Sequence, residues 1–160
     1  MSARHEIALT VNGEAVREAV EPRKTLVDFL REDLGLTGSH VGCEHGVCGA
    51  CTVRLDGAMV RGCLVLAVHC DGARVETIEG VSDSGALGDL QDAFAARNAL
   101  QCGYCTPGML LAADELLQGG GAPSREQIRA YIAGNYCRCT GYEAIVDAIA
   151  AAAAVRGGRK

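Results

Sequence analysis

The chain has 160 residues, enough for one ordinary domain or two small ones. Its formal net charge of −5 argues against a nucleic-acid partner, because binding phosphates requires clustered Lys and Arg. Neither a signal-peptide pattern nor an apolar run of the roughly 18 residues that span a membrane is found. We therefore expect no membrane contact and a cytoplasmic location, where the nine cysteines indicate metal ligation or redox chemistry.

The first third of the sequence predicts a β-hairpin followed by a helix. Residues 7–11 alternate apolar and polar side chains, Asn12-Gly13 is a two-residue hairpin signal, and residues 14–20 return as a second strand. Thr25 is a good N-cap for a helix that runs to about Leu34.

A long glycine-containing loop over residues 36–51 precedes the remaining strands. Loops of this length are uncommon in compact domains unless they carry function. Further strands are expected over 52–55, 58–61 and 74–77. Together with the hairpin and the helix, they predict a small mixed β-grasp-like sheet with the loop at its edge.

A polar segment over residues 80–85 predicts a boundary between a first domain, residues 1–80, and a second domain, residues 81–160. Beyond it the apolar period changes from 2 to 3.6, which is typical of helices. Four helices are expected: one around 87–94, one from Pro107 to Gln118, one from the Ser124 capping box to Ala133, and one from Tyr142 to Val155. The predicted fold class is therefore α+β, with a four-helix second domain.

The loop over residues 36–51 contains the most specific motif of the chain. Cys43, Cys48 and Cys51 are spaced C-x4-C-x2-C, and Cys63 follows at a distance. This is the plant-type ferredoxin spacing, in which four thiolates hold a [2Fe–2S] cluster. A structural zinc site is the alternative, but zinc knuckles favour two C-x2-C pairs.

A second group of cysteines belongs to the helical half. Cys102 and Cys105 form a C-x2-C pair before one predicted helix, and Cys137 and Cys139 form a C-x-C pair before the last one. Helix N-termini favour negative charge, as an iron–sulfur centre on four thiolates requires. By spacing alone, zinc and iron–sulfur both stay open here. The ninth thiol, Cys70, is expected to be a buried small hydrophobe.

Three motifs together resemble one known family, the molybdenum hydroxylases (xanthine dehydrogenase, aldehyde oxidoreductase and carbon monoxide dehydrogenase). The motifs are Cys43-Glu-His-Gly-Val-Cys48-Gly-Ala-Cys51, Gln101-Cys-Gly-Tyr-Cys105-Thr-Pro-Gly108 and Asn135-Tyr-Cys-Arg-Cys-Thr-Gly-Tyr142. The chain is similar to the small iron–sulfur subunit of this family. The resemblance implies a β-grasp ferredoxin-like first domain and a four-helix second domain, each with one [2Fe–2S] cluster.

The resemblance also implies a role for each motif. It places one cluster nearest FAD, held by Cys43, Cys48, Cys51 and Cys63, and the other nearest molybdenum, held by Cys102, Cys105, Cys137 and Cys139. Gln101 and Cys139 match positions that contact the molybdenum–pterin cofactor. Electrons would pass one at a time from molybdenum through both clusters to FAD.

The same resemblance implies a large molybdenum-binding subunit, a medium FAD-binding subunit and a dimer of heterotrimers. The chain would then be part of an oxidoreductase with no catalytic residue of its own. A stand-alone ferredoxin-type electron carrier is the alternative, although one cluster would suffice for that role. The substrate belongs to the large subunit, so carbon monoxide, aldehydes, purines and N-heteroaromatic compounds all stay open.

Overall fold

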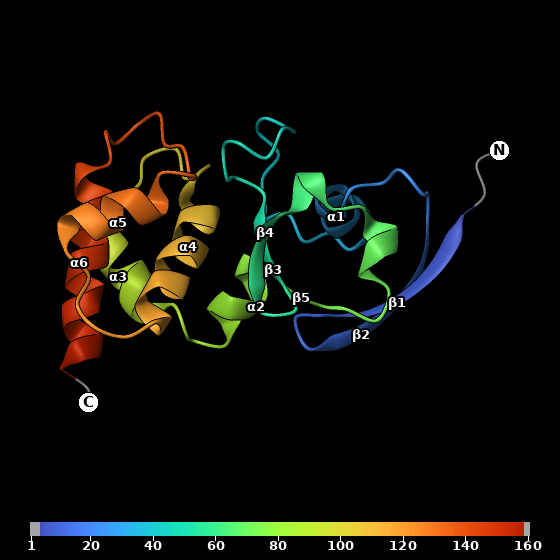
Figure 1. Cartoon of the computed structure of the whole chain (residues 1–160), viewed down its shortest axis with the longest axis horizontal. Coiled ribbons are helices and arrows are strands. Elements are labelled where there is room, and N and C mark those ends of the chain that lie inside the picture. Colours follow the sequence, from blue (N-terminus) through green and yellow to red (C-terminus); the bar gives the residue numbers. More distant parts are fainter. Residues whose placement is uncertain (1–3, 159–160) are drawn as a thin grey trace.

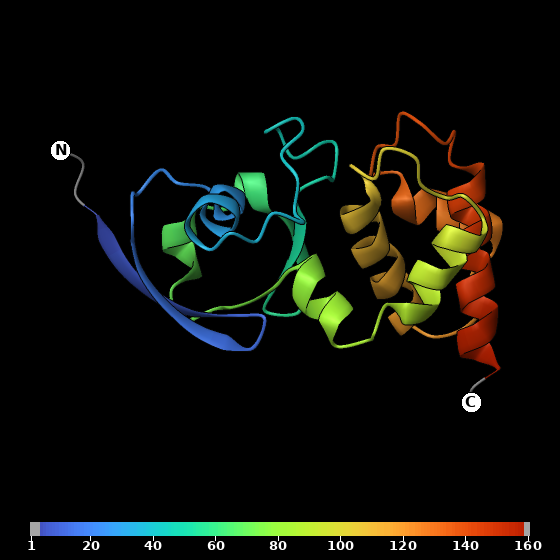
Figure 2. The same ribbon diagram turned by 180° about the vertical axis from the view of Figure 1, so that it is seen from behind.

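The computed structural model describes residues 4–158, which form a sheet at one end and a group of helices at the other. Figure 1 shows the β1–β2 hairpin and helix α6 at opposite ends, with the strand pair β3–β4 facing helix α4 in the middle. The view from behind in Figure 2 gives the same arrangement. The α+β class predicted from the sequence is confirmed.

The sheet has five strands in the order β2-β1-β5-β3-β4. The β1–β5 pair is parallel, while β1–β2, β3–β4 and β3–β5 are antiparallel, so the sheet is mixed as predicted. The predicted Asn12-Gly13 hairpin is present, and both turn residues have the positive φ that such a turn requires. The strands are β1 (His5–Val11), β2 (Glu14–Val20), β3 (Thr52–Leu55), β4 (Ala58–Arg61) and β5 (Arg74–Glu76).

The helix predicted after Thr25 begins where expected, but its hydrogen bonding changes after one turn. Thr25 caps α1 (Leu26–Asp28), because its hydroxyl accepts from the Asp28 amide. The chain then widens into a π-helical turn over Phe29–Asp33, in which the Leu34 amide donates to the Phe29 carbonyl at 3.3 Å. Two 3₁₀ turns, Gly62–Leu64 and Ala67–Cys70, precede β5.

Five helices follow the sheet, one more than the sequence predicted. The additional helix, α2, covers most of the segment expected to be a break. Gly80 belongs to this helix because the Asn12 side chain leaves no room for a Cβ at that position. Ile78 and Val81 of α2 are buried. The helices are α2 (Ile78–Asp83), α3 (Gly88–Ala96), α4 (Thr106–Gln118), α5 (Arg125–Ile132) and α6 (Glu143–Gly157).

The apolar side chains form two separate cores. One lies between the sheet and α1 and includes Leu9, Phe29 and Val53. The other lies among the helices and includes Phe94 and Ile149. In the part of the chain that the structure describes, no helix is long and apolar enough to cross a membrane.

Replacing the fully buried Phe94 with alanine should destabilise the helical core. We expect Phe94→Ala to lower the free energy of unfolding by about 3–5 kcal/mol, since the ring leaves a cavity that its neighbours fill only in part. Denaturant unfolding of the purified protein measures this change. Val155→Ala, at a side chain that is 46% exposed, is the control and should change stability by less than about 1 kcal/mol. Equal losses in both variants would contradict the assignment of Phe94 to the core.

Candidate iron–sulfur centres

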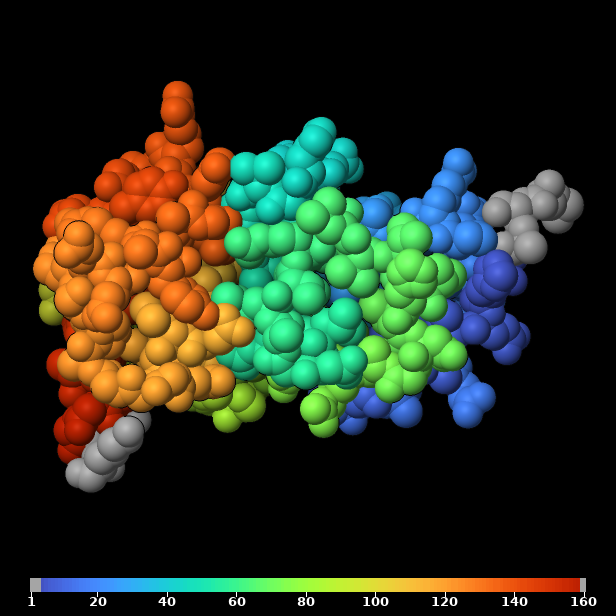
Figure 3. Space-filling model, viewed as in Figure 1, coloured from blue at the N-terminus to red at the C-terminus, as the bar shows by residue number. Residues whose placement is uncertain are grey.

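Three loops carry the cysteines of interest, apart from Cys63, to one edge of the molecule. In Figures 1 and 2 the loop of residues 40–51, the loop of residues 98–105 and the loop of residues 134–142 all lie along the upper edge. The space-filling view shows the first and the third as neighbouring protrusions with a hollow between them (Figure 3). Segments far apart in sequence are therefore close together in the fold.

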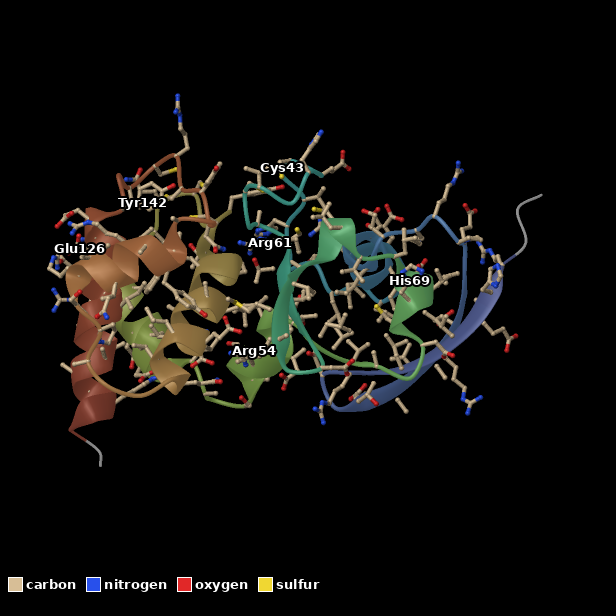
Figure 4. All side chains as sticks on the ribbon, viewed as in Figure 1. Cys43, Arg54, Arg61, His69, Glu126 and Tyr142 are labelled. Atoms are coloured by element: carbon tan, nitrogen blue, oxygen red, sulfur yellow. The ribbon has the colours of Figure 1, made fainter. Side chains whose placement is uncertain are left out.

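The first four cysteines come together in one neighbourhood. The Cys48 amide donates to the Cys43 sulfur, and the Cys51 thiol interacts with the thiols of Cys63 and Cys48. Cys43 lies on the exposed loop labelled in Figure 4, whereas Cys51 is buried at the start of β3.

Backbone amides stabilise the thiolate form of Cys43. The amides of His45 and Cys48 each donate to its sulfur at 3.4 Å, and they lower the pKa of Cys43 to about 6. Burial acts in the opposite direction at Cys51, where it raises the pKa of the thiol to about 11, with a further contribution from Cys63. Such amide–sulfur hydrogen bonds are among the features that tune the potential of an iron–sulfur centre.

The second four cysteines come together as two pairs. The sulfurs of Cys102 and Cys139 lie 3.5 Å apart, and the thiols of Cys105 and Cys137 interact with each other. Burial, followed by the neighbouring Cys137, raises the pKa of Cys105 to about 12. Burial alone would also raise the pKa of Cys137, but hydrogen bonds from Thr140 outweigh it and lower that pKa.

The two groups of sulfurs fit [2Fe–2S] clusters. Such a cluster is held by four thiolates, two on each of its two irons. Four thiols in each half of the chain match the donor set of a two-iron centre.

The two groups of cysteines are joined by direct contacts between their loops. The Tyr136 amide, next to Cys137, donates to the carbonyl of Cys48 at 2.8 Å. Beside it, the Asn135 side chain donates to the Gly49 carbonyl at 3.2 Å. One hydrogen bond thus links the backbone of a cysteine in the first group to the residue before a cysteine in the second group.

Glycine allows this close approach. Gly49 has φ +76°, and a Cβ there would lie 2.5 Å from the Gly134 carbonyl. Gly108, in the first turn of α4, faces it so closely that a Cβ would overlap the Gly49 carbonyl oxygen. A larger residue at position 49 would push the first loop away from Gly134, and one at position 108 would push α4 away from the first loop.

Two further side chains connect the first loop and its strand to the other two loops, and the sequence did not single out either of them. Arg61 donates from β4 to the Gly134 carbonyl at 2.9 Å and to the Thr52 hydroxyl. His40 stacks on the Tyr104 ring with the ring centroids 4.4 Å apart. Their partners lie 73 and 64 residues away in sequence, a separation that no local pattern reveals.

Gln101, Cys139 and Cys70 are the remaining candidates, and they lie in different surroundings. Gln101 is exposed, and its side chain donates to the carbonyl of the exposed Cys139 at 3.0 Å. Both therefore lie on the surface at the second group of cysteines, to which Cys139 belongs. Cys70 is buried in the core of the sheet, as expected for the thiol with no assigned ligand role.

Each half of the chain matches a known family of iron–sulfur domains. Residues 9–76 match the family described as "2Fe-2S iron-sulfur cluster binding domain", and residues 77–150 match "[2Fe-2S] binding domain". The nicotine 6-hydroxylase small subunit of Paenarthrobacter nicotinovorans is 53% identical over 92% of this chain and 89% of its own length. The caffeine dehydrogenase subunit gamma of Pseudomonas sp. (strain CBB1) is 51% identical over 91% of this chain and 89% of its own length.

A solved structure has the same fold. In the crystal structure of quinoline 2-oxidoreductase from Pseudomonas putida 86, the matching chain is 50% identical and superposes with a TM-score of 0.91. The match covers 99% of this chain and 98% of the other one. The ferredoxin-like fold that the sequence motifs implied is thereby confirmed.

Fold and domain matches together define an iron–sulfur electron-transfer protein with two [2Fe–2S] clusters. Because the relatives are subunits of dehydrogenase and hydroxylase complexes, a stand-alone ferredoxin is not favoured. The chain belongs to the small iron–sulfur subunits of the molybdenum hydroxylase family. It relays electrons within a multi-subunit oxidoreductase whose molybdenum–pterin cofactor and FAD lie on larger partner subunits.

Replacing Gly108 with alanine should disturb the contact between α4 and the loop of residues 40–51. We expect Gly108→Ala to destabilise the protein by about 1–3 kcal/mol, because the methyl group overlaps the Gly49 carbonyl. The control is Gly88→Ala at the first residue of α3, where a Cβ meets nothing within 4 Å, so stability should change by less than about 1 kcal/mol. Thermal unfolding of both variants measures the difference, and a stabilised Gly108→Ala would contradict the tight contact.

Proposed function

We propose that the two groups of thiolates hold one [2Fe–2S] cluster each. Cys43, Cys48, Cys51 and Cys63 hold the first, and Cys102, Cys105, Cys137 and Cys139 hold the second. The interactions between thiols within each group support this assignment, as does the absence of any other cysteine beside them in residues 4–158. When bound, each cluster supplies one-electron transfer.

The hydrogen bond from the Tyr136 amide to the Cys48 carbonyl is the observation that carries the proposed relay. Only a few bonds separate each end of this hydrogen bond from a proposed ligand, since Cys48 is itself one and Tyr136 precedes Cys137. Asn135 and Arg61 hold the two backbone segments together at this point. These hydrogen bonds support a relay in which the two groups of thiolates lie close together.

The surfaces beside the two groups suggest where the partner subunits bind. Val47 and Leu64, which adjoin proposed ligands of the first cluster, are 49% and 63% exposed, and Leu64 packs on Gly46. Exposed apolar side chains grouped in this way mark interaction surfaces. We assign this patch to the medium FAD-binding subunit.

The other surface lies at the second group of cysteines. Leu100, Tyr104 and Tyr136 are exposed there, beside the polar pair of Gln101 and Cys139. We assign it to the large subunit, with Gln101 and Cys139 contacting the molybdenum–pterin cofactor. Electrons then enter at this end and leave beside Val47 and Leu64.

The proposed organisation has two domains, residues 1–80 and 81–160, and a four-helix second domain built from α3, α4, α5 and α6. The separate cores of the sheet and of the helices support a division near this point, although α2 already packs in the second core. We further propose a dimer of heterotrimers located in the cytoplasm. The absence of a membrane-spanning helix among the described residues is compatible with that location.

An N-heteroaromatic compound is the proposed substrate class of the complete enzyme. The relatives at about half identity or more are named for caffeine, nicotine and quinoline, each of which contains nitrogen in a ring. Two aldehyde oxidoreductases are less similar, that of Megalodesulfovibrio gigas at 46% identity and the iron–sulfur subunit of Escherichia coli (strain K12) at 40%. Sequence similarity in this small subunit therefore favours the nitrogen heterocycles over aldehydes.

Removing one proposed ligand of the second cluster should interrupt the relay. In the assembled enzyme we expect Cys102→Ser to stop electron transfer from molybdenum to FAD, while substrate still reduces the molybdenum centre. Rapid-mixing absorbance measurements follow the bleaching of FAD after substrate is added. Cys70→Ser is the matched control, because it removes a buried thiol outside both groups. Unchanged steady-state turnover in Cys102→Ser would contradict the proposal.

A further inference from the structure

A buried ion pair connects the sheet to the helices at a distance from the cysteine loops. Arg54, on β3, donates to a carboxylate oxygen of Asp114, on α4, at 2.5 Å. The two side chains are only 10% and 2% exposed. Figure 4 shows Arg54 between the sheet and the helices, farther from the upper edge than Arg61.

The same carboxylate has a second arginine partner within the helical half. Arg156, on α6, contacts the other oxygen of Asp114 at 2.8 Å and also pairs with Asp89 of α3. Gln118 completes the set with a 2.7 Å hydrogen bond to Asp114. Asp114 therefore holds one arginine from the sheet and one from its own half.

A pair of this kind contributes little net stability but imposes a strict geometry. The cost of burying both charges offsets most of their attraction, so an apolar pair of similar size is often as stable. The position of an ion pair is nevertheless narrowly defined, because each charge needs its partner at hydrogen-bond distance. Arg54 and Asp114 can thus fix how β3 lies against α4.

Both elements extend directly from proposed cluster ligands. Strand β3 begins at the residue after Cys51, and helix α4 begins at the residue after Cys105. A shift of β3 along α4 would therefore move the two groups of thiolates relative to each other. It would also stretch the hydrogen bond between the Tyr136 amide and the Cys48 carbonyl.

We propose that Arg54 is a positioning residue for electron transfer between the clusters, and that its pairing with Asp114 sets their spacing. This inference rests on the proposed assignment of a cluster to each half of the chain. In the step concerned, a single electron leaves the cluster of the helical half, which is oxidised, and reduces the cluster of the sheet. Arg54 touches neither group of thiolates and acts only through the placement of β3.

Two substitutions separate positioning from stability. Arg54→Met breaks the link between sheet and helices but leaves Asp114 paired with Arg156. Arg156→Met removes a charge from the same carboxylate, and its ion pair with Asp89 as well, but leaves the link intact. Arg54→Lys retains a charge that can still reach Asp114, so it tests rescue.

The assembled enzyme, reduced with dithionite, provides two readouts. Electron paramagnetic resonance at low temperature detects the magnetic interaction between the two reduced clusters, as line splitting or faster spin relaxation. Hydrogen exchange followed by mass spectrometry reports on the Tyr136 amide through peptides that cover residues 134–137. We expect Arg54→Met to weaken the interaction and speed the exchange, Arg156→Met to change neither, and Arg54→Lys to restore both in part.

Retention of the wild-type magnetic interaction and exchange in Arg54→Met would overturn the positioning role. Equal changes in Arg54→Met and Arg156→Met would also overturn it, because both variants would then act through stability. Failure of the underlying assignment looks different. In that case the wild-type enzyme itself would lack one of the two cluster signals.

Discussion

The structure depends on the direct contact between two cysteine-bearing loops from different halves of the chain. The Tyr136 amide meets the Cys48 carbonyl at 2.8 Å, with only glycine at the neighbouring positions 49 and 108. Each half of the chain supplies four sulfurs for a cluster. An electron relay also requires the two arrangements to lie close together, and this contact provides that proximity.

The surrounding residues serve the same constraint in different ways. Arg61 and Asn135 hold the touching backbone segments by hydrogen bonds. The His40–Tyr104 stack joins the first loop to the loop of residues 98–105. Farther away, the Arg54–Asp114 pair links β3 to α4. The two separate apolar cores keep each half folded, so the charged and hydrogen-bonded contacts need only determine how the halves meet.

Local signals in the sequence predicted most of the fold and the grouping of the cysteines. The Asn12-Gly13 hairpin and the Ser124 capping box act within a few residues, and both are present. Helix α2 was missed because Gly80 reads locally as a breaker, whereas packing against Asn12 requires a glycine there. The partners of Arg54 and Arg61 lie 60 and 73 residues away. In the sequence, the acidic Asp114 within a largely apolar helical run is a hint that this side chain needs a charged partner.

The number of clusters per chain decides whether each half of the molecule holds a [2Fe–2S] centre. Iron and acid-labile sulfide are measured on the purified subunit, and the unpaired spins are counted by electron paramagnetic resonance after full reduction. We expect about four irons, about four sulfides and two distinct signals of about one spin each per chain, since each [2Fe–2S] cluster contributes two irons and one unpaired electron when reduced. About two irons with one signal, or zinc in a colourless protein, would contradict it.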